Sequence, residues 1–171
     1  VERSIVGVHD ANFVRPLGDE EIINGGFSNG STDWNLGTGW SISGGTANAL
    51  SAGSAVSITQ NGVVEIGKTY KITYTISNYV EGGIYFRAGS GTNGNIRQEN
   101  GTFTEIVTQS GNTTFYLTCY TGSTTLSIDN VSVKEVLVNR ESTATNTGIV
   151  ERNLTGVNES DLWLDSESTS V

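Results

Sequence analysis

Short runs of alternating apolar and polar residues, interrupted by Gly, Asn, Ser and Thr, constrain the fold of this chain more than any other feature. Between residues 69 and 77 every second residue is large and apolar: Tyr70, Ile72, Tyr74 and Ile76. A period of two places such residues on one face of a β-strand. Helix formers are scarce, since the chain has no Met and 22 Gly. The pattern therefore predicts an all-β fold, an antiparallel β-sandwich.

The same alternation predicts a candidate ligand platform on the solvent side of two further strands. Apolar residues alternate with polar and aromatic ones along residues 84–88 and 114–120. If the aliphatic and Phe positions point inward, the opposite face collects Tyr85, Arg87, Tyr116 and Tyr120. Sugar rings stack on aromatic side chains while their hydroxyls bind donors such as guanidinium groups, which indicates a glycan platform. Nearby polar loop residues are Asn95, Arg97, Gln98 and Glu99. The alternative is that these tyrosines cover a sheet face or a subunit interface.

The apolar positions also predict a single core and one strand irregularity. The expected core includes one set of seven residues: Phe27, Trp40, Ile72, Phe86, Leu117, Ile128 and Val131. The apolar phase changes between Ile128 and Val131, and a β-bulge at residues 129–130 would restore it. Cys119, the single cysteine, is expected to be a buried thiol without a disulfide partner.

Two motifs at the ends of this region resemble a known family. Residues 24–30 read NGGFSNG, with Trp34 and Trp40 following, and residues 127–134 read SIDNVSVK. In this order the motifs resemble carbohydrate-binding-module jelly rolls of the galactose-binding-like type. The resemblance implies a jelly-roll β-sandwich. Such modules occur on secreted glycan-degrading enzymes and in virion proteins of tailed bacteriophages.

The resemblance also implies one structural calcium ion. In the family, the Asp of the closing motif helps to bind calcium together with backbone oxygens and an acidic residue near the opening motif. The matching positions are Asp129 and Asn24, but Ser28 stands where relatives often have an acidic residue. Calcium prefers 6–8 oxygen ligands, so the missing charge matters. The alternative is that Asp129 accepts hydrogen bonds from the backbone of residues 24–27.

Composition along the chain predicts one domain with two arms. Residues 1–20 are expected to form an extended N-terminal arm, residues 21–137 the jelly-roll sandwich, and residues 138–171 a linker and C-terminal arm. Apolar clusters in both arms are expected to pack on other subunits: Ile5, Val6, Val8, Leu162, Trp163 and Leu164. Residues 1–10 and 150–159 share five identities, which would let both arms occupy equivalent grooves.

Charge and motif content exclude several classes of function. A net charge of −9 without a basic cluster argues against nucleic acid and anionic membranes as partners. No apolar run approaches the roughly 20 residues that span a bilayer. The single histidine, His9, lies in the arm, and the carboxylates show no recognisable pairing, so an enzyme is not expected.

The sequence thus predicts a non-enzymatic structural or display protein located outside the cell or on a virion surface. The first interpretation is a bacteriophage virion component, either capsid decoration or part of a tail or fibre. One alternative is a subunit of an extracellular filament or surface layer joined through its arms, with copies of itself as partners. The other is a glycan-binding module of a secreted polysaccharide-degrading enzyme.

Overall fold

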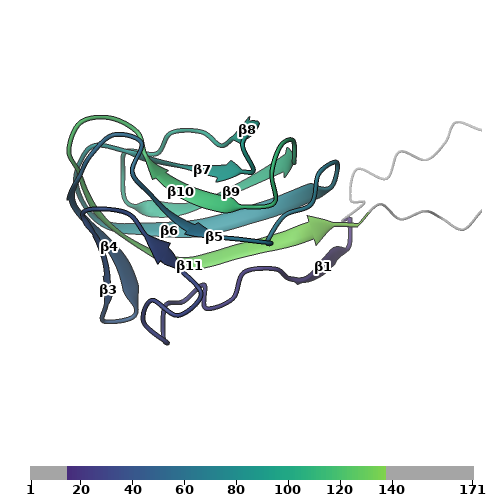
Figure 1. Ribbon diagram of the computed structural model, residues 1–171, viewed down its shortest axis with the longest axis horizontal. Coiled ribbons are helices and arrows are strands. Elements are labelled where there is room, and N and C mark those ends of the chain that lie inside the picture. The colour runs from purple at the N-terminus through teal and green to yellow at the C-terminus, as the bar shows by residue number, and fades with distance from the viewer. Residues whose placement is uncertain (1–14, 138–171) are drawn as a thin grey trace, which may run out of the picture. The chain divides into compact units, whose positions relative to one another are not determined.

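A computed structural model describes residues 15–137 of the chain, which fold into two stacked antiparallel sheets (Figure 1). Sheet A has the order β3-β4-β11-β6-β9, with β1 also paired to β11. Its strands are β1 (Leu17–Glu20), β3 (Trp40–Ser43), β4 (Thr46–Ala52), β6 (Thr69–Glu81), β9 (Gly101–Thr108) and β11 (Thr124–Val136). Sheet B has the order β2-β5-β10-β7-β8. Its strands are β2 (Asn35–Leu36), β5 (Ser57–Gln60), β7 (Ile84–Ala88), β8 (Thr92–Asn93) and β10 (Phe115–Cys119). The all-β jelly-roll sandwich expected from the sequence is confirmed.

The core lies between the two sheets and is built from the alternating positions. Along the first eight residues of β6, half-buried and buried side chains alternate without a break. The seven residues predicted for the core belong to one cluster, and the most exposed of them, Trp40, is 7% exposed. Phe86 is fully buried, with its ring 6.4 Å from those of Tyr74 and Phe115. Cys119 is buried there as a free thiol, and burial raises its pKa above the usual range.

The predicted bulge at residues 129–130 is confirmed. Asp129 pairs with Thr75, but the next pair in the ladder is Ser132 with Thr73, so β11 carries one extra residue at this point. Asn130 adopts a φ of 53°, a left-handed conformation that Asn tolerates better than most residues. The bulge lets Ile128 and Val131 both face the core although they are three residues apart.

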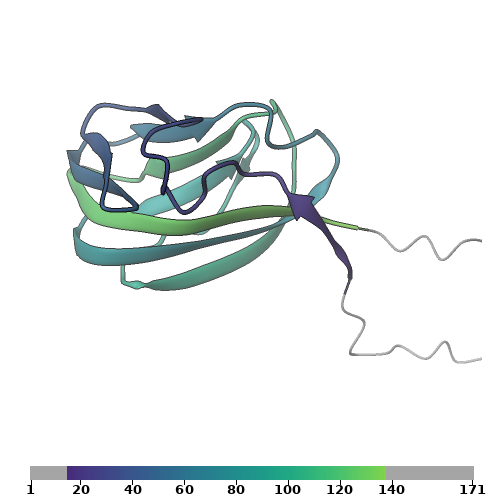
Figure 2. The same ribbon diagram turned by 90° about the horizontal axis from the view of Figure 1, so that it is seen from below.

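The expected boundary between arm and sandwich at residue 21 is wrong. Residues 17–20 form β1, which pairs with the end of β11, with Leu17 opposite Val136 and Glu20 opposite Lys134. Figure 2 shows β1 lying alongside β11. The glutamate holds this strand in place, because Glu20 Oε1 accepts a hydrogen bond of 2.6 Å from the amide of Val133. The strand reads LGDE and has a single large apolar residue, Leu17, so it shows no alternation and the pairing was not predictable from the sequence.

Candidate functional site

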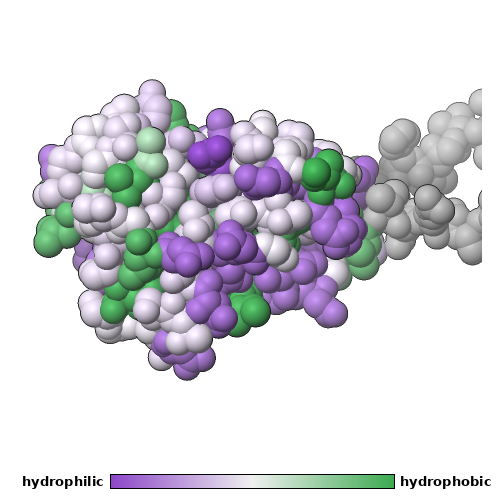
Figure 3. All heavy atoms as spheres, viewed as in Figure 1, coloured by the Kyte–Doolittle hydropathy of each residue, from purple (hydrophilic) through white to green (hydrophobic). Residues whose placement is uncertain are grey.

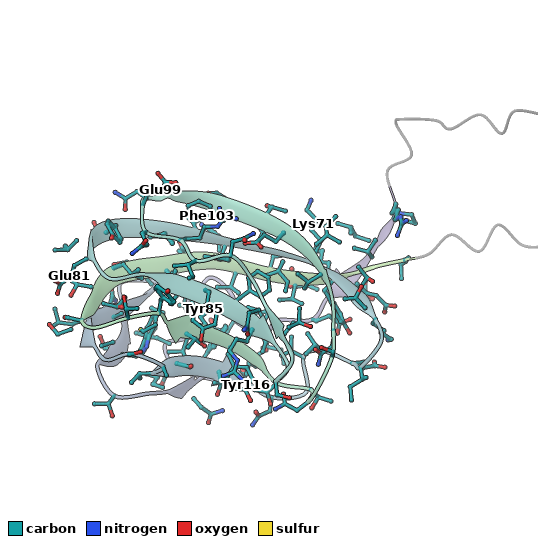
Figure 4. The ribbon with its side chains drawn as sticks, turned by 90° about the horizontal axis from the view of Figure 1, so that it is seen from above. Lys71, Glu81, Tyr85, Glu99, Phe103 and Tyr116 are labelled. Atoms are coloured by element: carbon teal, nitrogen blue, oxygen red, sulfur yellow. The ribbon has the colours of Figure 1, made fainter. Side chains whose placement is uncertain are left out.

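The outer face of sheet B, which points away from sheet A, gathers the side chains predicted as a platform. On β7, Tyr85 and Arg87 are half-buried between the buried Ile84, Phe86 and Ala88. On β10, Tyr116 stands between Phe115 and Leu117, and it pairs with Arg87 across the strands. Cross-strand partners of an antiparallel sheet share a face. The structure therefore brings Tyr85, Arg87 and Tyr116 together on one face. Figure 4 shows Tyr85 and Tyr116 on this sheet. Tyr120 follows directly after β10.

Arg87 and Tyr116 form the centre of a polar row that crosses all five strands. Asn35 on β2 pairs with Thr59 on β5, and Thr59 pairs with Tyr116. Tyr116 pairs with Arg87, and Arg87 pairs with Asn93 on β8. Neighbouring strands lie about 4.8 Å apart, so the four spacings give a row of about 19 Å. We refer to Asn35, Thr59, Tyr116, Arg87 and Asn93 as the sheet B row.

The central pair of this row is held by stacking. The guanidinium carbon of Arg87 lies 4.7 Å from the ring centroid of Tyr116, a cation–π contact. The phenol oxygen of Tyr116 accepts a hydrogen bond of 3.1 Å from the side-chain amide of Asn112. Within residues 15–137, Arg87 has no carboxylate within ion-pair distance. The ring of Tyr116 therefore positions the N–H donors of Arg87, and no described carboxylate forms an ion pair with them.

A second set of side chains lies beside the row. Ser57, Thr118 and Tyr85 are successive cross-strand partners on β5, β10 and β7. The hydroxyl oxygens of Ser57 and Thr118 lie 2.9 Å apart. The rings of Tyr85 and Tyr120 meet edge to face, with centroids 6.4 Å apart. This contact fixes the orientation of the exposed Tyr120 ring.

Each end of the sheet B row opens into a hollow. At the β8 end, a hollow of about 320 Å³ is lined by Tyr85, Asn93, Gly94, Ile96 and Tyr120. Gly94 is required there, because a Cβ at this position would overlap the ring of Phe86. At the β2 end, a hollow of about 340 Å³ is lined by residues of β2, β5 and their loops: Glu21, Ile23, Asp33, Trp34, Asn35, Gln60, Asn61, Gly62 and Val63. Asn93 and Asn35 each belong to the row and to the lining of one hollow, so a hollow adjoins each end of the row.

The loop residues expected to assist the platform are largely committed elsewhere. Arg97 donates to Glu105 at 2.9 Å and stacks over Phe103. Asn95 donates to the same carboxylate from its side chain at 2.7 Å. Gln98 donates to the carbonyl oxygen of Gly82. Glu105 points from the edge strand β9 toward the sandwich, and an inward charge of this kind protects a sheet edge from pairing.

The predicted bond between Asp129 and the opening loop is wrong. Asp129 Oδ1 accepts a hydrogen bond of 2.6 Å from the amide of its neighbour Asn130. The closing strand instead reaches the loop through the amide of Val131, which donates to the carbonyl oxygen of Gly25 at 2.9 Å. The reason is the left-handed conformation of Asn130, which favours a local side-chain to backbone bond.

The surroundings of Asp129 do not fit the calcium ion that the family resemblance implies. The side-chain amide of Asn24 donates to the carbonyl oxygens of Gly30 and Thr32, and its oxygen accepts from the amide of Asn29. Asn24 thus organises its own loop. Within residues 15–137 no three His, Cys, Asp or Glu side chains are grouped in a way that could hold a metal ion. Asp129 supplies one carboxylate, which is too little negative charge for a tight calcium site.

Other predictions lie outside what the structure describes. The residues proposed for assembly all fall before residue 15 or after residue 137: Ile5, Val6, Val8, Leu162, Trp163 and Leu164. Their packing on other chains stays a prediction. Among residues 15–137, no helix of the length and apolar character needed to cross a membrane was found.

Comparison with known proteins found similar solved structures at low sequence identity. The sequence matches no protein-family model and no curated protein. The xylan-binding domain CBM22-1 from Paenibacillus barcinonensis is similar, with a TM-score of 0.52 and 11% identity over 73% of this chain and 99% of that domain. A CBM4 structure has a TM-score of 0.47 and 17% identity, over 67% of this chain and 99% of that one. The N-terminal cellulose-binding domain of Cellulomonas fimi β-1,4-glucanase C has a TM-score of 0.43 and 17% identity, over 66% of this chain and 97% of that one. The resemblance to carbohydrate-binding-module jelly rolls is thereby confirmed for the fold.

Proposed function

We propose that the sandwich is a glycan-binding module whose ligand lies across the outer face of sheet B. The observation that carries this proposal is the stacked pair of Arg87 and Tyr116 at the centre of a row that joins two hollows. A sugar ring presents C–H groups that stack on an aromatic face, and its hydroxyls accept hydrogen bonds from guanidinium and amide groups. The row offers both kinds of contact side by side.

The shape of the site supports a chain of sugar units as the ligand. The row runs perpendicular to the strands for about 19 Å, and the hollows extend it at both ends. Amide groups stand at its two ends, in Asn35 and Asn93, and a hydroxyl stands in Thr59. A single monosaccharide would contact only part of this length. An oligosaccharide laid along the row would contact all five strands.

The chemistry of the row also supports binding without catalysis. The row holds amide, hydroxyl, phenol and guanidinium groups, whereas glycoside hydrolysis normally needs two carboxyl groups flanking the scissile bond. We therefore keep the expectation that the chain is not an enzyme. Extracellular localisation belongs to the same proposal, because polysaccharides such as xylan and cellulose lie outside the cell.

The shared fold of the xylan-binding domain from Paenibacillus barcinonensis supports the glycan-binding alternative over the virion interpretation. The virion and filament interpretations rest on the apolar clusters of the arms, which lie outside the described residues. They stay predictions from the sequence. A glycan-binding module is the function that residues 15–137 support best.

The test is affinity electrophoresis of the full-length chain in gels containing xylan, mannan, β-glucan or soluble cellulose derivatives. We expect at least one polysaccharide to retard the wild-type chain. Arg87→Gln should weaken that retardation about tenfold or more, since hydrogen bonds to charged groups contribute about 1.5–3 kcal/mol. Tyr116→Ala should weaken it as well, through loss of the stacking surface.

The matched control is Ile106→Ala, because Ile106 is 64% exposed on the opposite sheet and contributes nothing to the row. This variant should be retarded like the wild type. Unchanged retardation of Arg87→Gln and Tyr116→Ala would contradict the proposed site. Migration of the wild type unaffected by every polysaccharide would contradict the proposed function.

A further inference from the structure

The outer face of sheet A, which faces away from sheet B, carries two lysines that lack an acid partner. Lys71 on β6 and Lys134 on β11 are cross-strand partners, so their side chains leave the sheet side by side. The sequence holds one other lysine, Lys68, which binds Glu65 at 2.9 Å and Glu135 at 3.1 Å. Within residues 15–137, neither Lys71 nor Lys134 has a carboxylate within ion-pair distance.

The two lysines border a small hollow. Its volume is about 240 Å³, and it is lined by Leu17, Lys71, Thr73, Ser132 and Lys134. Thr73 and Ser132 are the next cross-strand pair along the same face. Lys71 and Lys134 are both half-buried, so their stems are held by the sheet and their positions are restricted. In Figure 4, Lys71 lies on sheet A, whereas Tyr85 and Tyr116 lie on sheet B. The hollow is therefore separate from the sheet B row.

The carboxylates on neighbouring elements are already engaged. Glu20 lies opposite Lys134 on β1, but its oxygens accept from the amide of Val133 and the hydroxyl of Ser132, each at 2.6 Å. Glu135 binds Lys68, and Asp129 accepts from the amide of Asn130. None of these carboxylates lies within ion-pair distance of Lys71 or Lys134, so neither ammonium group has a direct acid partner among the described residues.

Hydroxyl donors complete the hollow. The hydroxyl oxygens of Thr73 and Thr104 lie 2.9 Å apart, with one hydrogen between them. Either hydroxyl can be the donor, and when Thr104 donates to Thr73 the hydrogen of Thr73 is free for a ligand in the hollow. Ser132 directs its own hydrogen to Glu20 and can only accept. The hollow therefore presents two ammonium groups and one hydroxyl to a bound group.

We propose that Lys71 and Lys134 bind one oxyanion, a carboxylate or sulfate group, in this hollow. Like charges directly opposite each other in a sheet are destabilising, and an anion between them replaces repulsion by two charge-assisted hydrogen bonds. The chain as a whole carries a net charge of −9, which repels densely charged polyanions. The partner that fits is a single anionic group, either free in solution or carried by an acidic sugar.

The test is a titration of the ¹⁵N-labelled full-length chain, followed by amide chemical shifts. The probes are sodium sulfate, sodium glucuronate and neutral glucose, at constant ionic strength set with sodium chloride. We expect saturable shifts at residues 71–73 and 132–134 with sulfate or glucuronate and none there with glucose. Saturation by sulfate alone identifies a free oxyanion as the ligand, and tighter binding of glucuronate identifies an acidic sugar. Glucose shifts equal to those of glucuronate, or linear shifts with both anions, would overturn the proposal.

Three charge-matched variants separate a site from a general charge effect. Lys71→Gln and Lys134→Gln should each weaken the anion affinity about tenfold or more. Arg15→Gln removes the same charge from an exposed position that does not line the hollow and should bind like the wild type. Equal weakening in all three variants would refute a specific site. Tyr116→Ala should leave the titration unchanged, so a failure here is distinguishable from a failure of glycan binding on sheet B.

Discussion

The backbone amide of Val131 donates a hydrogen bond of 2.9 Å to the carbonyl oxygen of Gly25. This bond joins the opening loop to the closing strand, so the two motifs that define the family resemblance are in direct contact. The two chain segments approach so closely that a Cβ on Gly25 would overlap the carbonyl oxygen of Val131. A glycine at position 25 is therefore required by packing across more than a hundred residues of sequence.

We expect Gly25→Ala to lower the free energy of unfolding by at least about 2 kcal/mol, because the added methyl forces the backbone of β11 away. The matched control is Gly26→Ala, whose Cβ would have its nearest contact 3.9 Å away, at Asp129 Oδ1. That variant should change the stability by about 0.5 kcal/mol or less. Urea denaturation of both variants provides the measurement, and equal stabilities would contradict the close approach.

Phe86→Ala should lower the free energy of unfolding by about 3–5 kcal/mol, since it removes a fully buried ring between Tyr74 and Phe115 and leaves a cavity. Chemical denaturation measures the loss. Ile106→Ala, at a position 64% exposed, should stay within about 0.5 kcal/mol of the wild type. A loss below about 1 kcal/mol for Phe86→Ala would show that this side chain is not part of the core.

Tyr74→Phe should stabilise the protein by about 1 kcal/mol at pH 7, because Tyr74 Oη is buried without a hydrogen-bond partner among the described residues. Burial also raises the pKa of Tyr74 to about 12. An unfolded tyrosine loses its proton near pH 10, so the contribution of Tyr74 to stability is intact below pH 10 and is lost as the pH rises toward 12.

The phenylalanine variant has no such proton to lose. Its advantage over the wild type in urea denaturation should therefore widen between pH 9 and pH 11. A constant difference across this range would mean that Tyr74 ionises equally in the folded and unfolded states.

Removal of divalent cations should leave the melting temperature unchanged, because Asn24 is used within its loop and Asp129 binds the amide of Asn130. Asp129→Asn should also melt within a few degrees of the wild type, since the amide oxygen keeps that acceptor. Thermal melts with and without EDTA provide the measurement. A fall of several degrees in EDTA, reversed by calcium, would show that a cation stabilises the folded state by mass action.

The sequence carried a strong signal for everything that depends on the alternation within a single strand. The inward positions of β6, the outward positions of Tyr85, Arg87 and Tyr116, and the bulge at residues 129–130 all follow from a period of two. A strand with a clear alternation has only one way to bury its apolar face. Burial of Cys119 followed from the same pattern.

Features that depend on which strands become neighbours were not predictable. Asn35, Thr59 and Asn93 join the sheet B row only because β2, β5 and β8 pair in one particular register. Their strands are short, two of them only two residues long, and give no periodic signal. The sequence could suggest the central residues of the candidate site but neither its length nor its direction.

The lysine pair illustrates the same division. Lys71 and Lys134 lie 63 residues apart in the sequence. Lys71 stands between Tyr70 and Ile72, and Lys134 continues the alternation of Val131 and Val133, so both side chains are predicted to point outward. Their meeting depends on the register between β6 and β11, which the one extra residue of the bulge at Asp129 and Asn130 shifts. Alternation is a local property and sets the face on which a side chain stands. Strand order and register depend on contacts between distant segments, and in this chain only the tertiary structure decided them.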